Sequence, residues 1–312
     1  MTLAQIDEAL KRIQDGSVAS VNGINPNLLD NAYFANPVNQ RGQTEYSGGG
    51  YAIDRWKLSA QNVVAAIDDS GITVTNSQTW RAGLTQLVEV DLTKALIGKT
   101  VTASALVRVN SGNMQLAIGK TYTSAMQVES PAFRNSEFSL VSWTFVVPSD
   151  TTSMVFFMAA AAGASFTVKA VKLELGNTQT MARKDASGNW VLNEIPDYGE
   201  RLARCQRYQL VLDCTDAYEV IGSGYATSES YLRLMIPTPV SLRAVPAFSH
   251  TLTNFDAVGA GSSKTLMNAA APSRRLKPHA VLIYYSGLSG LATNETYMLQ
   301  AFGGKIILDA NL

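Results

Sequence analysis

Acidic residues that could act in pairs decide whether this 312-residue chain could hydrolyse a glycosidic bond. Three local pairs occur: Asp68 with Asp69, Glu194 with Asp197, and Asp216 with Glu219. Hydrolysis needs two carboxylates that face each other across the bond, about 5–10 Å apart. The first pair lies at a turn before Gly71, and the other two flank a linker. Since no pair is expected on neighbouring strands of one face, paired-carboxylate catalysis is not expected.

Nucleophilic and Cys/His metal chemistry also lack the residues that they need. The chain has two histidines, His250 and His279, both on expected strands, and it has no G-x-S-x-G motif. Two histidines and two cysteines are too few for the usual metal clusters. Asp54, Arg55 and Trp56 have the residue types of a triad. In "YAIDRWKL", however, the pattern favours Trp56 in a core and both charged residues near a domain edge.

Exposed aromatic rings are better candidates for binding. Trp80, in "NSQTWRAGL", follows a turn and is expected to be exposed. Its ring can stack on the apolar face of a sugar, and its edge carries a hydrogen-bond donor. Trp143, inside "SLVSWTFVV", is a weaker candidate because it lies within an expected strand.

Tyrosines and a basic cluster gather in the C-terminal third of the chain. The recognition candidates there are Tyr225, Tyr231, Tyr285, Tyr297, Arg274 and Arg275. Tyrosine combines a stacking face with a hydroxyl group at low entropic cost. Strand alternation places one of Tyr284 and Tyr285 in the core. The arginine cluster is either a solvated turn, which is favoured, or a contact for phosphate or acidic sugars.

The composition excludes several partners. Lys plus Arg and Asp plus Glu both number 25, so the formal net charge is zero, and no segment concentrates basic residues. Nucleic-acid binding through phosphate neutralisation is therefore not expected. The longest apolar run, residues 154–164, is about half of the roughly 20 residues that span a bilayer, so membrane insertion is not expected either. Without a signal-peptide pattern, synthesis in a cytoplasm favours free thiols at Cys205 and Cys214 over a disulfide.

The elements that must position these residues begin with a helix, expected over residues 2–15. Thr2 and Gln5 fit a capping box, and Gly16 fits a stop. Its apolar residues have heptad spacing: Leu3, Ile6, Leu10 and Ile13. Leu at a and Ile at d favours three or four helices over two. Two heptads cannot hold an oligomer alone, so the helix either packs on a neighbouring domain or helps to build a thread-like oligomer.

Two β domains are expected after this helix. Residues 27–176 alternate with period two and form an expected jelly-roll-like antiparallel β-sandwich, with strands at 72–76, 83–92, 100–110, 114–120, 139–148, 153–160 and 165–176. Residues 177–207 read as a linker with a short neck helix, in which Tyr198, Leu202 and Cys205 share one face. Residues 208–312 form a second β domain, with strands at 208–213, 231–240, 247–255, 279–286, 296–302 and 305–312. Gly303 and Gly304 suit a hairpin turn, and 259–278 reads as a long loop.

Several segments resemble tail-fibre and receptor-binding proteins of tailed phages and prophages. They are "NLLDNAYFANPVNQRG", "YAIDRWKL", "VKLELGNTQT", "LNEIPDYGERLARCQRY" and "MIPTPVSLRAVPAF". Residues 27–176 look like the carbohydrate-binding-module sandwiches of those fibres, and 208–312 look like their trimeric tip. The resemblance implies a homotrimer in the virion, synthesised in a host cytoplasm and attached through residues 1–26 to a tail or baseplate protein.

The function that this resemblance implies is attachment to a bacterial surface glycan by non-catalytic, multivalent binding. A structural baseplate or fibre-connecting subunit without receptor contact is the alternative, and a glycan-depolymerising tailspike is a third reading. No cofactor is expected. Sandwiches of this kind often hold a structural calcium ion near their opening segment, where Asn27 and Asp30 could supply oxygen ligands.

Overall fold

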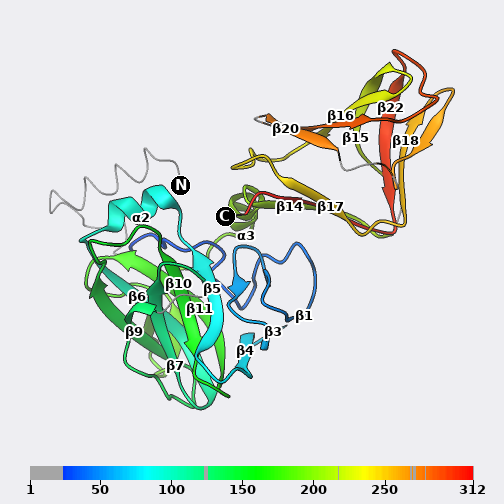
Figure 1. The fold of residues 1–312 in the computed structure, drawn as a ribbon. Helices are drawn as coiled ribbons and strands as arrows, with labels where there is room; N and C mark the ends of the chain where they lie inside the picture. The colour runs from blue at the N-terminus through cyan, green and yellow to red at the C-terminus, as the bar shows by residue number, and fades with distance from the viewer. Residues whose placement is uncertain are drawn as a thin grey trace. The chain divides into compact units, whose positions relative to one another are not determined.

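The computed structural model describes residues 24–122, 126–216, 218–267, 269, 272–277 and 279–311. The chain divides into two compact units, Met1–Asp197 and Tyr198–Leu312, here called the first and second unit. The helix expected over residues 2–15 lies outside the described residues. Both units are built mainly from antiparallel strands (Figure 1).

Two antiparallel sheets form the sandwich of the first unit. The six-stranded sheet has the order β1 (Glu45–Tyr46), β3 (Val63–Asp68), β4 (Gly71–Asn76), β11 (Ser165–Leu175), β6 (Thr100–Ser111) and β9 (Ser139–Val146). The five-stranded sheet has the order β2 (Lys57–Leu58), β5 (Ala82–Leu87), β10 (Val155–Ala160), β7 (Met114–Gly119) and β8 (Met126–Glu129). Because successive parts of the chain pass back and forth between the two sheets, the expected β-sandwich is confirmed.

One apolar core lies between these sheets. Trp56, Phe34 and Phe156 are fully buried in it, and the Trp56 ring meets the other two edge-on at 5.1 and 6.4 Å between centroids. Edge-to-face contacts of this kind are the preferred geometry of aromatic pairs. Trp143 belongs to the same core, where it stacks on Phe145, so it is not an exposed ring.

A helix in the sandwich was not expected. The sequence predicted a strand over 83–92, but β5 ends at Leu87 and α2 (Val90–Leu96) follows. Thr93 and Leu96 are the buried residues of this helix, and Figure 1 shows it lying across one end of the sandwich. The inward side chains Thr93 and Leu96 are three residues apart, which is a helical spacing. The β-rich residues just before them hid this signal in the sequence.

The opening segment of the sandwich is fixed by buried polar side chains. Asn31 bonds Val38 through both its amide nitrogen and its oxygen, at 2.8 Å each. Asp54 and Arg55 are only 2% and 3% exposed, so the prediction that they lie near the domain edge was wrong. Asp54 accepts two hydrogen bonds from Gln40, and the Arg55 Nε lies 3.1 Å from an Asp30 oxygen. These partners let charged groups remain inside the domain.

Residues 177–197, expected as linker, belong to the first unit. They contain the hairpin of β12 (Ala182–Lys184) and β13 (Trp190–Leu192). Met181 from this segment packs on Leu106 and Ala170 of the six-stranded sheet, with Trp190 against the same cluster. The linker composition therefore hid an element with apolar contacts of its own.

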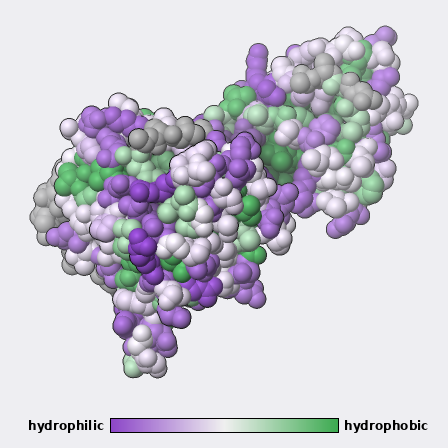
Figure 2. Space-filling model, turned by 60° about the horizontal axis from the view of Figure 1, so that its bottom comes forward, coloured by the Kyte–Doolittle hydropathy of each residue, from purple (hydrophilic) through white to green (hydrophobic). Residues whose placement is uncertain are grey.

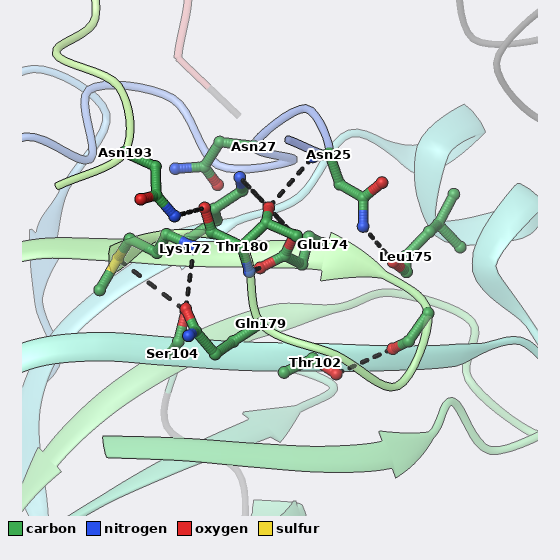
Figure 3. Close-up of polar contacts among 12 residues, drawn as sticks. Asn25, Asn27, Thr102, Ser104, Lys172, Glu174, Leu175, Gln179, Thr180 and Asn193 are labelled. Atoms are coloured by element: carbon green, nitrogen blue, oxygen red, sulfur yellow. Dashed lines mark hydrogen bonds and ion pairs between the residues drawn. The ribbon is translucent and has the colours of Figure 1, made fainter. Parts of the chain in front are cut away.

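A network of hydrogen bonds around a buried ion pair joins this segment to the start of the sandwich (Figure 3). Lys172 and Glu174 lie two residues apart on the same face of β11, and their side chains are 6% and 0% exposed. Thr180 connects them: its hydroxyl donates to Glu174 at 2.5 Å and accepts from Lys172 at 2.8 Å and from the Asn25 backbone N–H at 3.0 Å. Burial lowers the pKa of the Lys172 ammonium despite the carboxylate beside it. The network therefore connects the backbone at Asn25 to the segment around Thr180.

Two further sheets form the second unit. The three-stranded sheet has the order β14 (Gln209–Cys214), β23 (Gly304–Asp309) and β17 (Ala247–His250). The seven-stranded sheet has the order β19 (Ser263–Thr265), β18 (Asn254–Gly259), β22 (Thr296–Phe302), β15 (Glu219–Ser228), β16 (Tyr231–Pro237), β21 (Ala280–Ser286) and β20 (Ser273–Lys277). A second apolar core lies between them, with Phe255, Tyr297 and Leu299 fully buried.

The glycine pair at 303–304 does not make the expected hairpin. β22 and β23 belong to different sheets, and Gly303, at φ 73°, is where the chain crosses between them. A Cβ at Gly303 would meet Thr253 Oγ1 at 2.0 Å. The glycines thus serve a positive φ and a close approach.

Three other predictions for the second unit need correction. The strand expected over 247–255 is divided into β17 and β18, which belong to different sheets. The loop expected over 259–278 contains two strands, β19 and β20. β20 pairs with β21 in antiparallel orientation. In the neck helix α3 (Tyr198–Gln206), the buried residues are Arg201 and Cys205, whereas Tyr198 is 43% exposed. The Arg201 guanidinium lies 5.4 Å from the Tyr198 ring, so its aliphatic stem occupies the face predicted to be apolar. Cys205 and Cys214 are buried free thiols.

The surface is polar without being strongly ionic. Hydrophilic and hydrophobic residues are interspersed over the face that Figure 2 shows. Neither described helix is long and apolar enough to cross a membrane.

Candidate functional site: a cleft beside Trp80

An open cleft of about 970 Å³ lies on the first unit, on the outer side of the five-stranded sheet. It is called the Trp80 cleft below. Its described lining residues are Gly49, Ser59, Ala60, Gln61, Gln78, Trp80, Arg81, Tyr122, Met126, Glu129 and Phe157. They come from three kinds of element: the turn before β5, the strands β8 and β10, and the loops that flank them.

Phe157 forms the floor of the cleft. Its neighbours across the sheet are Thr85 on β5 and Ala117 on β7. Every residue of β10 is buried, because Phe156 and Met158 face the main core while Phe157 and Ala159 form a smaller cluster on the outer side. A strand with apolar side chains on both faces indicates that the outer face is covered or used. Here part of the cover is Met126 and Tyr122.

Trp80 stands on the wall of the cleft with 58% of its surface exposed, as its position after a turn predicted. The turn is held from below by Asn76, which is fully buried. The Asn76 amide donates to the Trp80 carbonyl oxygen at 2.8 Å and to the Ala160 carbonyl oxygen at 3.1 Å, and its oxygen accepts from the Gln78 N–H at 2.9 Å. The backbone that carries the indole is therefore fixed to the end of β10.

Charged and amide groups surround the apolar floor. Arg81 and Glu129 form an ion pair whose side chains are 39% and 45% exposed. On the other side, the Lys57 Nζ lies 4.5 Å from the centre of the Tyr122 ring, within cation–π distance. Burial raises the pKa of the Tyr122 hydroxyl, and Tyr51 nearby raises it further, so this hydroxyl stays protonated at neutral pH.

The cleft combines the groups that bind a sugar ring. An exposed indole offers a stacking face, and Phe157 and Met126 offer an apolar floor. Gln61, Gln78 and the Arg81–Glu129 pair offer donors and acceptors for hydroxyl groups. A few polar groups around an apolar base is the usual composition of a small-molecule site.

The acidic pairs considered from the sequence lie elsewhere. The Asp68 carboxylate accepts from the Ser70 hydroxyl and N–H, which hold its pKa below the ordinary value, and it thereby caps the β3–β4 turn. Of the described lining residues of the Trp80 cleft, Glu129 is the one carboxylate.

The residues considered for calcium are engaged in other contacts. The Asn27 side-chain oxygen accepts from the backbone N–H groups of Leu29 and Leu173, and Asp30 pairs with Arg55. No group of three or more His, Cys, Asp or Glu side chains in the described ranges is placed to hold a metal ion. The calcium hypothesis gains no support from this geometry.

Two tyrosines proposed for recognition in the second unit are in its core. Tyr285 is 3% exposed and Tyr297 is 0% exposed. Alternation along β21 turns Tyr285 inward and Tyr284 outward. The Tyr297 hydroxyl is satisfied inside the unit, where it shares a 2.6 Å hydrogen bond with Ser262 and accepts from the Ala292 N–H. Since both side chains are buried, the recognition role suggested for these two positions was wrong.

The other candidates of the second unit meet on the outer face of the seven-stranded sheet. Tyr225 is 45% exposed, Tyr231 is half-buried and Arg275 is exposed. Arg274 points to the opposite side, since its register partner on β21 is the buried Ile283. The basic cluster is therefore divided between two faces, as strand alternation requires.

Several cleft residues were missed from the sequence. Phe157 was included only in an expected strand, and Tyr122, Arg81 and Glu129 come from segments with no motif. Arg81 follows Trp80 directly, and Asn76 closes the strand before it, so a polar cluster around an exposed tryptophan was the available signal.

Neither a known protein family's model nor a curated protein sequence matches this chain. Among solved structures, the CBM22-1 xylan-binding domain of Xyn10C from Paenibacillus barcinonensis aligns at 13% identity and a TM-score of 0.31, over 50% of this chain and 98% of that domain. The tandem CBM22-1–CBM22-2 domain of the same protein aligns at 10% identity and a TM-score of 0.32, over 92% of this chain and 97% of its own.

A third solved structure contains the CBM22-1 and GH10 modules of Xyn10B from Clostridium thermocellum with xylohexaose. It aligns at 12% identity and a TM-score of 0.29, over 52% of this chain and 30% of that structure. Identities and TM-scores this low do not establish a shared ligand. The case for a ligand therefore rests on this chain's own residues.

Proposed function

We propose that this chain is a non-catalytic glycan-binding protein and that the Trp80 cleft is its binding site. One observation carries the proposal: a tryptophan ring with 58% of its surface exposed stands over an apolar floor edged with amide and charged groups. A ring of that size left in solvent costs free energy unless a ligand covers it. The asparagine bonds that fix its turn prevent the ring from folding inward with its backbone.

Binding would use the two kinds of surface together. One sugar ring stacks on Trp80 while a neighbouring unit of the chain lies over Phe157 and Met126. Hydroxyl groups then bond to Gln61, Gln78 and the Arg81–Glu129 pair, which already lie at the cleft. Because Gln61 and the Arg81–Glu129 pair are solvated before binding, the net gain at one site is modest and specificity comes from the positions of the polar groups.

A role without catalysis is part of the proposal. Hydrolysis by paired carboxylates needs a second acid opposite Glu129. In the described lining, Glu129 is the one carboxylate, and Arg81 holds it in an ion pair. The described lining therefore lacks the second acid that this mechanism requires.

The proposed setting is the virion of a tailed phage or prophage, and it is supported by the sequence resemblance alone. We propose a homotrimeric tail fibre or receptor-binding protein that is attached through residues 1–26 to a tail or baseplate protein and binds a bacterial surface glycan. Three copies of a weak site on one particle bind a repetitive polymer far more tightly than one copy does. A structural baseplate subunit and a glycan-depolymerising tailspike are the competing readings.

A glycan array probed with the full chain and with Trp80→Ala tests the proposal. We expect the wild type to bind a subset of glycans and Trp80→Ala to bind the same glycans about 10-fold more weakly or worse, since stacking and area are both lost. Val146→Ala is the matched control, because Val146 is 57% exposed and lies on the other sheet. The three proteins should melt at the same temperature.

Two outcomes would favour the competing readings. If the folded wild-type protein binds no glycan and no host cells, the result favours a structural baseplate subunit. If it releases reducing ends from host polysaccharide and Glu129→Gln abolishes that release, the protein is a depolymerase.

A further inference from the structure

A second group of aromatic and cationic side chains lies on the outer face of the seven-stranded sheet. It consists of Tyr225 on β15, Tyr231 and Arg233 on β16, Tyr284 on β21 and Arg275 on β20, and is called the tyrosine–arginine band. These residues span four neighbouring strands, so the band crosses more than half of the sheet.

The strand register puts the band together. Tyr225, Arg233 and Tyr284 are direct cross-strand neighbours. Along β16 the alternate residues Leu232 and Leu234 are buried in the core, which directs the band's side chains to the opposite face. Both Tyr225 and Arg233 are exposed, and Arg275 is exposed at the edge of the sheet.

Both guanidinium groups lie over tyrosine rings. The Arg233 Cζ is 5.8 Å from the centre of the Tyr231 ring, and Arg233 also donates to the Tyr225 hydroxyl at 3.4 Å. The Arg275 Cζ is 5.7 Å from the centre of the Tyr284 ring. Tyr231 and Tyr284 are themselves neighbours, with ring centroids 6.3 Å apart. A guanidinium stacked in this way still has N–H groups at its edge that can donate to a planar anion.

The positive charge of the band is not neutralised by the protein. Among the described residues, neither Arg233 nor Arg275 lies within ion-pair distance of a carboxylate. An arginine without a carboxylate beside it attracts an anion more strongly than an arginine in an ion pair, such as Arg81 with Glu129, does.

We propose that the tyrosine–arginine band is a second binding site and that its ligand is an acidic polysaccharide with carboxylated sugar rings. The tyrosine rings match the apolar faces of pyranose rings, and the guanidinium forks match their carboxylates. β16 and β20 are two strand spacings apart, so the backbones of the two arginines are separated by about 10 Å across the sheet. A polymer with repeated negative charges can therefore engage both arginines at once. This site does not depend on the Trp80 cleft.

The test uses the full chain and three acidic polysaccharides: polygalacturonate, alginate and hyaluronan. We expect at least one of them to bind, and its methyl-esterified form, which keeps the rings but loses the charge, to bind at least about 10-fold more weakly. Arg233→Gln with Arg275→Gln should weaken binding by about the same factor. Arg233→Lys with Arg275→Lys keeps the charge but not the fork and should recover only part of the affinity.

A charge-matched control separates the site from net charge. Arg108→Gln with Arg134→Gln removes the same two charges from the first unit, and Arg108 also lies over an aromatic ring, Phe138, at 5.0 Å. We expect this control to bind the acidic polysaccharide like the wild type. All these substitutions lie at exposed or half-buried positions, so the melting temperature serves as the check on folding.

The two binding sites can fail separately. Trp80→Ala should keep acidic-polysaccharide binding, and the Arg233/Arg275 variants should keep binding to the glycans that the Trp80 cleft takes. The proposal is overturned if no acidic polysaccharide binds, if the esterified form binds equally well, or if the arginine variants bind like the wild type. Preference for a phosphate polymer or single-stranded DNA overturns it too, as does a loss of self-association in the arginine variants, which would mark an interface between copies.

Discussion

Thr180 is the residue at which the buried polar network of the first unit converges. Its hydroxyl contacts Glu174, Lys172 and the Asn25 N–H, all at 3.0 Å or less. We expect Thr180→Val to lower the free energy of unfolding by about 2–3 kcal/mol, since valine removes the hydroxyl that hydrogen-bonds both members of the buried ion pair. Chemical denaturation measures this, and Thr178→Val, at an exposed hydroxyl that contacts only Asn177 in the described network, should change stability by less than about 0.5 kcal/mol. Equal effects in both variants would contradict this role for the network.

Asp54 gives the first unit a characteristic pH dependence. Burial raises the pKa of its carboxyl above the ordinary value of 3.8, against the lowering effect of the Gln40 hydrogen bonds and the Arg41 charge. Between these two pKa values the folded state binds more protons than the unfolded state. The stability that Asp54 contributes is therefore present at low pH and is lost as the pH rises through the folded-state pKa.

Comparison of the wild type with Asp54→Asn isolates this effect. The unfolding free energy of the wild type minus that of the variant should decrease as the pH rises from about 4 to about 7. Urea titrations at several pH values measure the difference. A difference that stays constant or grows with pH would show that the Asp54 pKa is not raised.

At the residue scale, the sequence predicted the burial of side chains whose environment depends on local sequence. Trp80 after a turn and Trp56 in the core were both assigned correctly. Asp54 and Arg55 were misplaced because their partners, Gln40 and Asp30, lie 14 and 25 residues away. Nothing local indicates that a charged residue will find such a partner, so buried polar networks are the hardest feature to predict.

The β3–β4 hairpin is the element with the most restrictive turn. Gly71 has φ +127°, and a Cβ there would meet the Val168 carbonyl oxygen at 2.2 Å. We expect Gly71→Ala to cost about 2–4 kcal/mol in unfolding free energy, since it adds backbone strain to a collision with β11. Gly98→Ala is the control, because φ is +71° and nothing lies within 4 Å of the added carbon. Gly98→Ala should lower the unfolding free energy by about 1–2 kcal/mol. Thermal or urea unfolding measures both variants. An equal loss of stability in the two would contradict the account.

At the element scale, alternation predicted many of the strands to within a few residues, but β3 and the long strand β15 were not expected. Residues 100–110 and 296–302 were expected as strands, and β6 and β22 are found there. Helix α2 and strand β20 were missed because their signals are short, and β20 depends on pairing with β21 rather than on its own residues. The crossing at Gly303 was mistaken for a hairpin, since a two-glycine turn looks the same whether the next strand pairs locally or enters another sheet.

For the whole molecule, the proposed homotrimer makes a direct prediction. Analytical ultracentrifugation of the full chain should give three times the mass of one chain, independent of concentration over the micromolar range. Trimerisation would raise the apparent affinity for a polymer by presenting three clefts together. A monomer at all concentrations would contradict the fibre reading while leaving glycan binding by the cleft intact.

The sequence predicted two β domains but not which one offers a cleft. Recognition candidates were named in both domains, and the described cleft that joins aromatic, amide and charged groups lies in the first unit. Its residues come from positions 49–157, and they meet only when β5, β8 and β10 pair in one sheet. Long-range assembly of this kind leaves no spacing pattern in the chain.

The most direct test of the central claim is the indole N–H signal of Trp80 in an NMR titration with the glycan that binds best on the array. The account predicts that the Trp80 signal shifts progressively to saturation. The Trp56 signal should not move, since its ring is fully buried and its N–H bonds the Asn31 carbonyl oxygen at 3.0 Å. Saturable glycan binding with an unchanged Trp80 signal would contradict the assignment of the cleft as the binding site.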